Sequence, residues 1–192
     1  MYKNKHFITQ DIKGENFGDN KFLNCTFVNT NLKLSSFKNC EFKDCDFTGV
    51  IFEMTAFESC SFSECKLNNL DFSQADFLKC KFESSVIKNS IFQTYKIGEK
   101  NIKTISKLKY SMFIDCDLSN SVFIKCDLTE SSFVKSILHR TLFENCNLTK
   151  TDFTGARIDG VGFNDSKIDK TKIDMQGLIN FGLSKGFVLS ES

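Results

Sequence analysis

The sequence predicts a solenoid of short strands, because large apolar residues recur at a fixed spacing of five. Between positions 36 and 62, phenylalanine occupies every fifth place: Phe37, Phe42, Phe47, Phe52, Phe57 and Phe62. A small residue lies two positions before each of them, such as the cysteine at 40, 45 or 60. This period matches neither the helix repeat of about 3.6 residues nor the alternation of a strand. It requires a backbone that turns a corner at each unit and sends one large and one small side chain inward.

The five-residue frame covers most of the chain in two runs, at 7–92 and 113–178. Of the 22 phenylalanines, only Phe181 and Phe187 lie outside these runs. Near the start the pattern of small residues decays, and the small positions are filled by Lys5, Gln10, Glu15 and Asn20. We therefore expect residues 1–20 to form an irregular first coil or an N-terminal cap.

Individual units resemble the repeat of the pentapeptide-repeat proteins, which is a small residue, Asp or Asn, Leu or Phe, and two polar residues. CDFTG at 45–49, CDLTE at 126–130 and TDFTG at 151–155 match this pattern. The resemblance implies an all-β fold, a right-handed quadrilateral parallel β-helix with four pentapeptides in each coil. It also implies that residues 1–174 form a single β-helix domain.

The composition agrees with a stack of paired strands in a reducing compartment. The chain contains no proline, which would remove amides that pair between coils. All nine cysteines occupy the small inward position, where a free cysteine acts as a compact apolar residue. Their spacing lacks the short Cys pairs of zinc sites, so we expect neither a metal nor a cofactor. An odd cysteine count without a signal sequence or a long apolar stretch favours a cytoplasmic protein that does not cross a membrane.

The stretch between the two runs departs from the frame. Phe113 follows Phe92 by 21 positions, which indicates a bulge or an inserted loop of one, six, eleven or sixteen residues. We expect a loop that projects at about 95–110. Five lysines and one glutamate give this stretch a net charge of +4, whereas the remaining 20 basic and 23 acidic residues give the rest of the chain a net charge of −3. Such an insertion is either a solvated connection or a contact loop. For a contact loop, the predicted partner-binding residues are Tyr95, Lys96, Lys100, Lys103, Lys107, Lys109 and Tyr110.

The C-terminal segment 175–192 is predicted to be a helix followed by a strand at 187–189. Apolar residues at 175, 178, 179 and 183 have helical spacing, and Asp174 is a suitable N-cap. A solenoid must cover its last coil, either by capping or by pairing with a second copy. The text IDKTKIDMQGLINFGLSKGFVL resembles the tail of the Qnr group of pentapeptide-repeat proteins, which form dimers through it. The resemblance implies a homodimer interface at Ile173, Met175, Leu178, Ile179, Phe181, Phe187 and Val188.

The residues of the chain do not indicate an enzyme. His6 and His139 are isolated, and aspartates such as Asp46 and Asp152 belong to the repeat, where they favour turns. The Qnr resemblance implies a DNA-mimicking rod that binds DNA gyrase or topoisomerase IV and protects it from fluoroquinolones or a peptide toxin. The rod charge of −3 is low for such a mimic.

The alternative is a pentapeptide-repeat scaffold for another protein partner. Its contact face would use the outward apolar residues Ile51, Met54, Val122, Ile124, Val134 and Leu142. Direct nucleic-acid binding is not expected, because the lysine-rich stretch has few interleaved aromatic residues.

Overall fold

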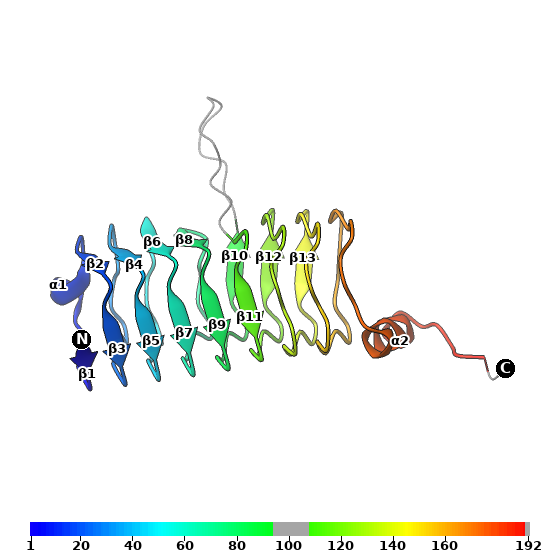
Figure 1. Cartoon of the computed structure of the whole chain (residues 1–192), viewed down its shortest axis with the longest axis horizontal. Helices are drawn as coiled ribbons and strands as arrows, with labels where there is room; N and C mark the ends of the chain where they lie inside the picture. Colours follow the sequence, from blue (N-terminus) through cyan, green and yellow to red (C-terminus); the bar gives the residue numbers. More distant parts are fainter. Residues whose placement is uncertain (94–107, 191–192) are drawn as a thin grey trace, which may run out of the picture.

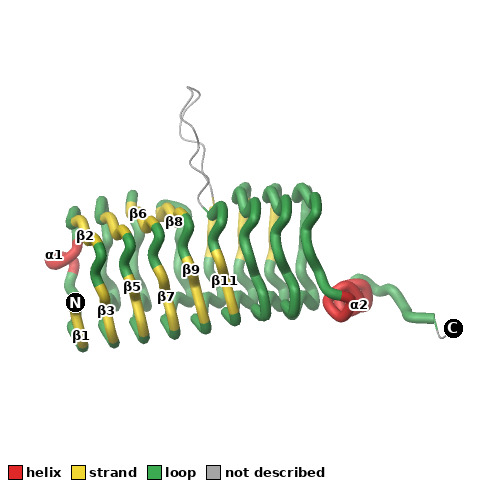
Figure 2. Tube along the Cα trace, viewed as in Figure 1, coloured by secondary structure: helices red, strands yellow, loops and turns green. Residues whose placement is uncertain are grey.

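The computed structural model describes residues 1–93 and 108–190, which form a rod of stacked coils with the two termini at opposite ends (Figure 1). Successive coils pair in register and in parallel, so each coil adds one layer to the rod. The predicted quadrilateral parallel β-helix is therefore confirmed. Figure 2 shows that regular strands are concentrated in the N-terminal part of the rod, whereas the C-terminal coils are mostly turns and bridges.

Three of the four faces contain named strands. A six-stranded sheet holds β1 (Tyr2–Lys3), β3 (Lys21–Leu23), β5 (Glu41–Lys43), β7 (Ser61–Ser63), β9 (Lys81–Glu83) and β11 (Met112–Ile114). A four-stranded sheet holds β2 (Asn16–Gly18), β4 (Ser36–Lys38), β6 (Thr55–Glu58) and β8 (Ala75–Leu78). The third sheet holds β10 (Ile91–Gln93), β12 (Val122–Ile124) and β13 (Leu142–Glu144). The fourth face is a row of isolated bridges, which includes those between His6 and Thr26 and between Ile137 and Arg157.

The core consists of columns of stacked rings that run along the rod. The Phe42 ring lies 4.7 Å from Phe22 and 4.8 Å from Phe62, centroid to centroid, and these rings are at most 1% exposed. In the C-terminal half, leucine or isoleucine replaces phenylalanine in two of the columns. There the remaining rings approach each other edge to face, as Phe113 and Phe123 do at 6.1 Å. Each buried side chain contributes roughly 1.5–3 kcal/mol, so the columns supply the main stabilisation of a rod that has no globular core.

The small position has a second role, because its side chain donates a hydrogen bond to the preceding coil. Ser35 Oγ donates to Ile12 O at 2.7 Å, Thr141 Oγ1 to Leu118 O at 2.9 Å, and Cys60 Sγ to Phe37 O at 3.3 Å. These bonds satisfy buried backbone carbonyls. The position therefore selects a hydroxyl or thiol donor as well as a small volume, which the sequence analysis did not anticipate.

The corners are formed by residues in the left-handed region. Asn24, Asn39 and Asn69 have φ of 49°, 54° and 59°, and Gly49 has φ of 69°. Asparagine and glycine tolerate this conformation better than other residues, which accounts for their frequency at the last position of the unit. Leu34, with φ of 59°, is an exposed apolar exception.

The first coil pairs in register with the second but differs in its side chains. Tyr2 continues the aromatic column, with its ring 5.1 Å from that of Phe22, and α1 (Thr9–Ile12) replaces one corner. Its small positions hold longer polar residues, such as Lys5 and Gln10. The Lys5 ammonium lies 4.4 Å from the centre of the Phe7 ring and covers part of this end of the rod.

The coil that contains the insertion holds 11 additional residues. Phe113 pairs with Phe82, 31 positions earlier, whereas Phe82 pairs with Phe62, 20 positions earlier. Of the four lengths that the frame shift allowed, the structure thus selects eleven. Leu108 is 1% exposed and belongs to the core, so the expected loop boundary at 110 was too late.

The chain beyond the last coil also departs from the prediction in part. The predicted helix is α2 (Met175–Ser184), but residues 187–190 have no regular secondary structure. The strand expected at 187–189 is absent. No neighbouring coil pairs with this segment. Leu178 does not continue the inward frame, since it lies in α2 and is 53% exposed.

Candidate partner-binding surfaces

The C-terminal end of the rod is joined to α2 through Asp174. One carboxylate oxygen of Asp174 accepts from the Gly177 amide at 2.7 Å and caps the helix, as predicted. The other oxygen accepts from the Gly155 amide in the last coils. These two hydrogen bonds hold the pKa of Asp174 below its ordinary value. The carboxylate thus takes the place of a backbone acceptor in a further coil.

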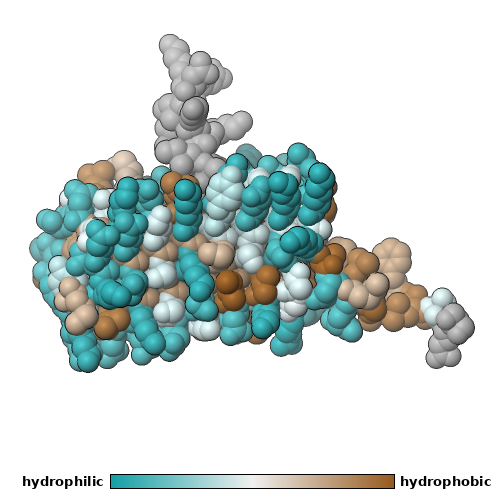
Figure 3. Space-filling model, viewed as in Figure 1, coloured by the Kyte–Doolittle hydropathy of each residue, from teal (hydrophilic) through white to brown (hydrophobic). Residues whose placement is uncertain are grey.

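The residues predicted for a dimer interface gather at this end, although they differ in exposure. Met175 is 72% exposed, Phe187 72% and Val188 88%, whereas Ile179 is half-buried. Phe181 is also half-buried, and its ring lies 5.6 Å from that of Phe163 in the last complete coil. Exposed residues that the sequence analysis missed are Ile168, Leu183 and Leu189. Figure 3 shows the resulting apolar surface over α2 and the tail.

The segment predicted to contact a partner is only partly described. Tyr95, Lys96, Lys100, Lys103 and Lys107 lie outside the described residues. Lys109 and Tyr110 belong to the wall of the rod, where Tyr110 forms a corner with φ of 62°. The Lys109 ammonium lies 5.0 Å from the centre of the Tyr110 ring. These two residues therefore lie beside the point where the chain re-enters the coil.

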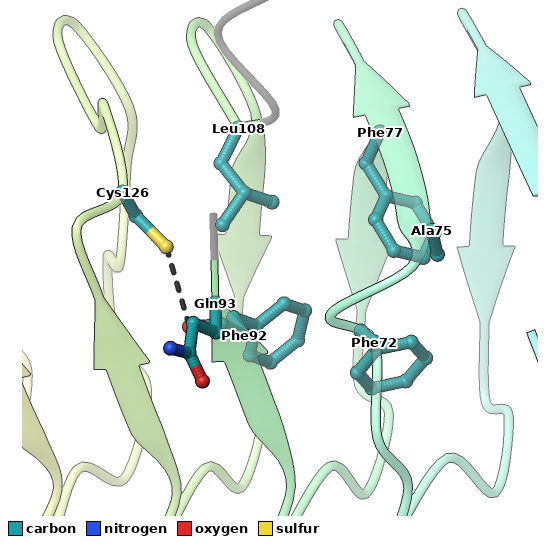
Figure 4. A pocket seen from close by; sticks show the side chains of 7 residues that line it. All are labelled: Phe72, Ala75, Phe77, Phe92, Gln93, Leu108 and Cys126. Atoms are coloured by element: carbon teal, nitrogen blue, oxygen red, sulfur yellow. Dashed lines mark hydrogen bonds between the residues drawn. The ribbon is translucent and has the colours of Figure 1, made fainter. Parts of the chain in front are cut away.

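The insertion also leaves a small gap in the core at its base. Figure 4 shows Leu108 near Phe77 and Phe92, with Cys126 on the opposite side. The cavity between them measures about 10 Å³, which is close to the minimum that holds one water molecule. It is lined mainly by apolar side chains and is too small for a substrate or cofactor.

Several charged side chains on the N-terminal coils are paired with a partner one coil away. The ammonium of Lys21 lies 2.8 Å from Glu41, that of Lys33 lies 2.7 Å from Glu53, and that of Lys38 lies 3.2 Å from Glu58. The aspartates of the repeat also hold turns, as predicted: Asp152 accepts from the Thr154 amide at 2.9 Å. These pairs reduce the negative charge that is free to imitate phosphates.

The remaining polar candidates have structural partners. His139 points outward, and its ring nitrogen Nδ1 pairs with Asp159 in the next coil. All nine cysteines are free and buried, and burial raises the pKa of Cys116 to about 12, which keeps the thiol protonated and unreactive. Among the described residues, no cluster of three or more potential ligands is arranged to hold a metal ion. In the same part of the chain, no helix has the length and apolar character needed to cross a membrane.

The outward apolar residues proposed for a scaffold do not share one face. Val122, Ile124 and Leu142 lie on the outer side of the third sheet, and Ile51 lies on the same face of an earlier coil. Val134 lies on a different face, in the layer that follows β11. Met54 lies at a corner with φ of 50°. The sequence predicted their outward direction, but their grouping depends on the stacking of the coils.

Replacing Asp174 with alanine is expected to release α2 while the coils stay folded. Because the pKa is lowered in the folded protein, the contribution of this carboxylate is fully present above about pH 4. That contribution is lost as the pH falls through the folded pKa. Hydrogen exchange should report rapid exchange across Met175–Ser184 in Asp174→Ala and in wild type at low pH. Asp174→Asn is the matched control, since it retains an acceptor oxygen. Protection of the helix amides in Asp174→Ala would contradict the role of Asp174 in holding α2.

Comparison with known proteins assigns the chain to a family. The sequence matches the pentapeptide repeat region over residues 4–99 and 105–173. No curated protein sequence matches it. A solved structure of a trypsin-treated variant of QnrB1, a plasmid-mediated fluoroquinolone resistance protein, is 18% identical with a TM-score of 0.49 and full coverage of both chains.

Two further solved structures are more distant. Full-length QnrB1 is 18% identical, covers 97% of each chain and has a TM-score of 0.37. HetL of the cyanobacterium Nostoc sp. strain PCC 7120, which is involved in heterocyst differentiation regulation, is 10% identical, with 89% and 90% coverage and a TM-score of 0.22. Because the family match spans both runs of the repeat, the chain belongs to the pentapeptide-repeat family.

Proposed function

We propose that the protein is a dimeric binding module for a type II topoisomerase, either DNA gyrase or topoisomerase IV. In this role it protects the enzyme from fluoroquinolones or from a peptide toxin. The observation that carries the proposal is the C-terminal segment, whose sequence resembles the Qnr tail and whose apolar side chains are exposed at the end of the rod. In this proposal, the protein protects the topoisomerase by binding to it and not by catalysing a reaction.

A second copy of the chain is the proposed occupant of the exposed C-terminal end. Met175, Leu178 and Phe187 are between 53% and 72% exposed, and Ile168 in the last coils is 59% exposed. Pairing of two such ends about a twofold axis buries both at once and produces a rod of twice the length. Contiguous exposed apolar surface of this kind is typical of an interaction site.

The eleven inserted residues are the proposed topoisomerase contact. They enlarge a single coil of an otherwise regular stack, and the sequence around them carries the basic excess of the chain. Insertions in repeat proteins are common sites of partner contact. The lysines at 96, 100 and 103 would then approach acidic groups of the enzyme or the phosphates of its DNA.

The paired surface charges favour a second candidate, a scaffold for a partner other than a topoisomerase. Residues 1–93 carry 11 lysines and 12 carboxylates, and many of these lie within 4 Å of an opposite charge on the next coil. A DNA mimic needs unpaired carboxylates along one face. The two functions are distinguished by whether the protein acts on a topoisomerase at all.

Deletion of residues 97–107 is the sharpest test of the topoisomerase proposal. This deletion removes eleven residues, restores the 20-residue register and places Leu108 at its core position. In a gyrase supercoiling assay with ciprofloxacin, the wild-type protein is expected to restore supercoiling, and the deletion variant is expected to lose this effect. The same titration with topoisomerase IV decatenation identifies the preferred enzyme.

The control for this deletion is the replacement of the three lysines that it removes, at 100, 103 and 107, with serine. This variant keeps the chain length and separates the role of charge from that of the segment itself. Thermal unfolding of both variants should match the wild type, because the core columns are unchanged. Absence of any effect of wild-type protein on either enzyme at micromolar concentration would refute the topoisomerase role and favour the scaffold.

A further inference from the structure

The sheet formed by β10, β12 and β13 carries apolar residues on both of its sides, and Gln93 and Glu144 are the polar exceptions on the outer side. Its inward residues, Phe92, Phe123 and Phe143, are at most 2% exposed. Strand residues alternate between the two sides, so the residues between them face outward. Four of these form what we call the outer apolar face: Ile91, Val122, Ile124 and Leu142. Strands that are apolar on both sides are typical of sheets covered on both sides.

The outer apolar face runs along the axis of the rod. Ile91 pairs with Val122, and Val122 pairs with Leu142, so these side chains are one strand layer apart. Layers are separated by about 4.8 Å. At the equivalent outward positions of the six-stranded sheet, Lys21 and Glu41 form an ion pair instead. The apolar row is therefore a local feature, and the repeat does not require it.

This spacing matches one side of an α-helix. A helix rises about 5.4 Å in each turn, close to the separation of the layers. A helix that lies along the rod therefore sets one apolar residue per turn against one layer of the sheet. Apolar residues at i, i+3 or i+4 and i+7 supply such a stripe, and docking of this kind is a common mode of peptide recognition.

Two cations flank the outer apolar face at opposite corners. Lys125 follows Ile124 directly, and Arg140 lies two residues before Leu142. Both are exposed, and within the described part of the chain neither side chain has an ion-pair or hydrogen-bond partner, unlike Lys33 or Lys38. The three strands carry one outward carboxylate, Glu144. The net positive flanks complement an occupant that carries carboxylates beside its apolar side.

We propose that the outer apolar face binds an amphipathic α-helix of a partner protein, laid along the rod and acidic on its flanks. Its apolar residues contact Ile91, Val122 and Leu142, and its carboxylates approach Lys125 and Arg140. This contact is separate from the C-terminal end and does not depend on the topoisomerase proposal. The outer apolar face is thus a second binding surface, and the rod can hold the partner helix and its first partner at the same time.

The test uses fluorescence anisotropy with three labelled model helices of equal length. One carries leucine at the a and d positions and glutamate on its flanks, the second replaces glutamate with lysine, and the third is a scrambled acidic sequence. The acidic amphipathic helix should bind most tightly, and Val122→Lys or Ile91→Lys should weaken it by at least about tenfold. Combined Lys125→Glu and Arg140→Glu should shift the preference to the lysine helix.

The controls exclude binding elsewhere on the rod. Val134→Lys introduces the same change on another face at similar exposure, and Phe187→Asp alters the apolar C-terminal end. Neither should change the affinity for the acidic helix, and circular dichroism confirms that each variant is folded. The proposal is overturned if wild-type protein binds none of the helices or binds the scrambled helix equally well. It is also overturned if Val122→Lys and Ile91→Lys both bind like wild type.

Discussion

Replacing Phe123 with alanine is expected to lower the free energy of unfolding by about 3–5 kcal/mol, the range for a large aromatic removed from a closed core. The Phe123 ring is fully buried between Phe92 at 4.7 Å and Phe143 at 4.9 Å. It also meets the edges of Phe113 and Phe133 at 6.1 Å and 5.7 Å. These four rings come from another coil or another face, so the space left by alanine is bounded by rings that the stacked coils hold in place. Denaturation in urea, followed by circular dichroism, measures the change.

Phe123→Leu is the matched control for this substitution. Leucine already occupies equivalent inward positions, such as Leu118 and Leu128, and retains much of the apolar volume. It should destabilise the rod markedly less than alanine. If alanine and leucine cause equal losses, or if alanine causes none, the stacked column is not the main source of stability.

Replacing Phe187 with aspartate is expected to convert the proposed dimer to a monomer without unfolding the coils. Phe187 is 72% exposed and lies beyond α2, so a charge there does not disturb the packing of one chain. In a dimer, the aspartate side chain at this position would be buried as an unpaired carboxylate, which carries a large desolvation penalty. Light scattering should report half the wild-type mass, with the same thermal transition of the coils at low protein concentration.

Leu34→Asp is the control for this second substitution. Leu34 is 54% exposed at a corner far from the C-terminal end, and aspartate tolerates its left-handed conformation. This variant should keep the wild-type mass. An unchanged mass for Phe187→Asp would remove the proposed interface, and a lower mass for Leu34→Asp would place the contact elsewhere on the rod.

The repeating part of the fold could be predicted because its signal is local. Each pentapeptide specifies its own inward residue, such as Phe57 or Leu148, and its own corner residue, such as Asn39. Neighbouring units have the same sequence pattern, so the inward columns can be identified without knowledge of contacts between distant residues. The helix cap at Asp174 could be predicted for the same reason, since its partner Gly177 lies three residues away.

The candidate surfaces were less predictable, because they depend on contacts between coils. The pairing of Lys21 with Glu41 joins residues 20 positions apart, and it neutralises charges that look free in the sequence. The second bond of Asp174, to Gly155, likewise reaches back across a coil. The apolar row of Ile91, Val122 and Leu142 arises only once the coil with the insertion is in register.

The five-residue period predicted a solenoid with inward columns of large side chains and located the interruption of the repeat, and the resemblance to the pentapeptide-repeat proteins implied the four sides of each coil. The stacking of the coils set the length of the interruption, which follows from the pairing of Phe82 with Phe113 across 31 positions. It also decided which outward side chains meet and how much of the C-terminal end stays uncovered. The physical reason is that inward packing repeats within each coil, whereas surfaces and ends are formed by residues that only stacking brings together.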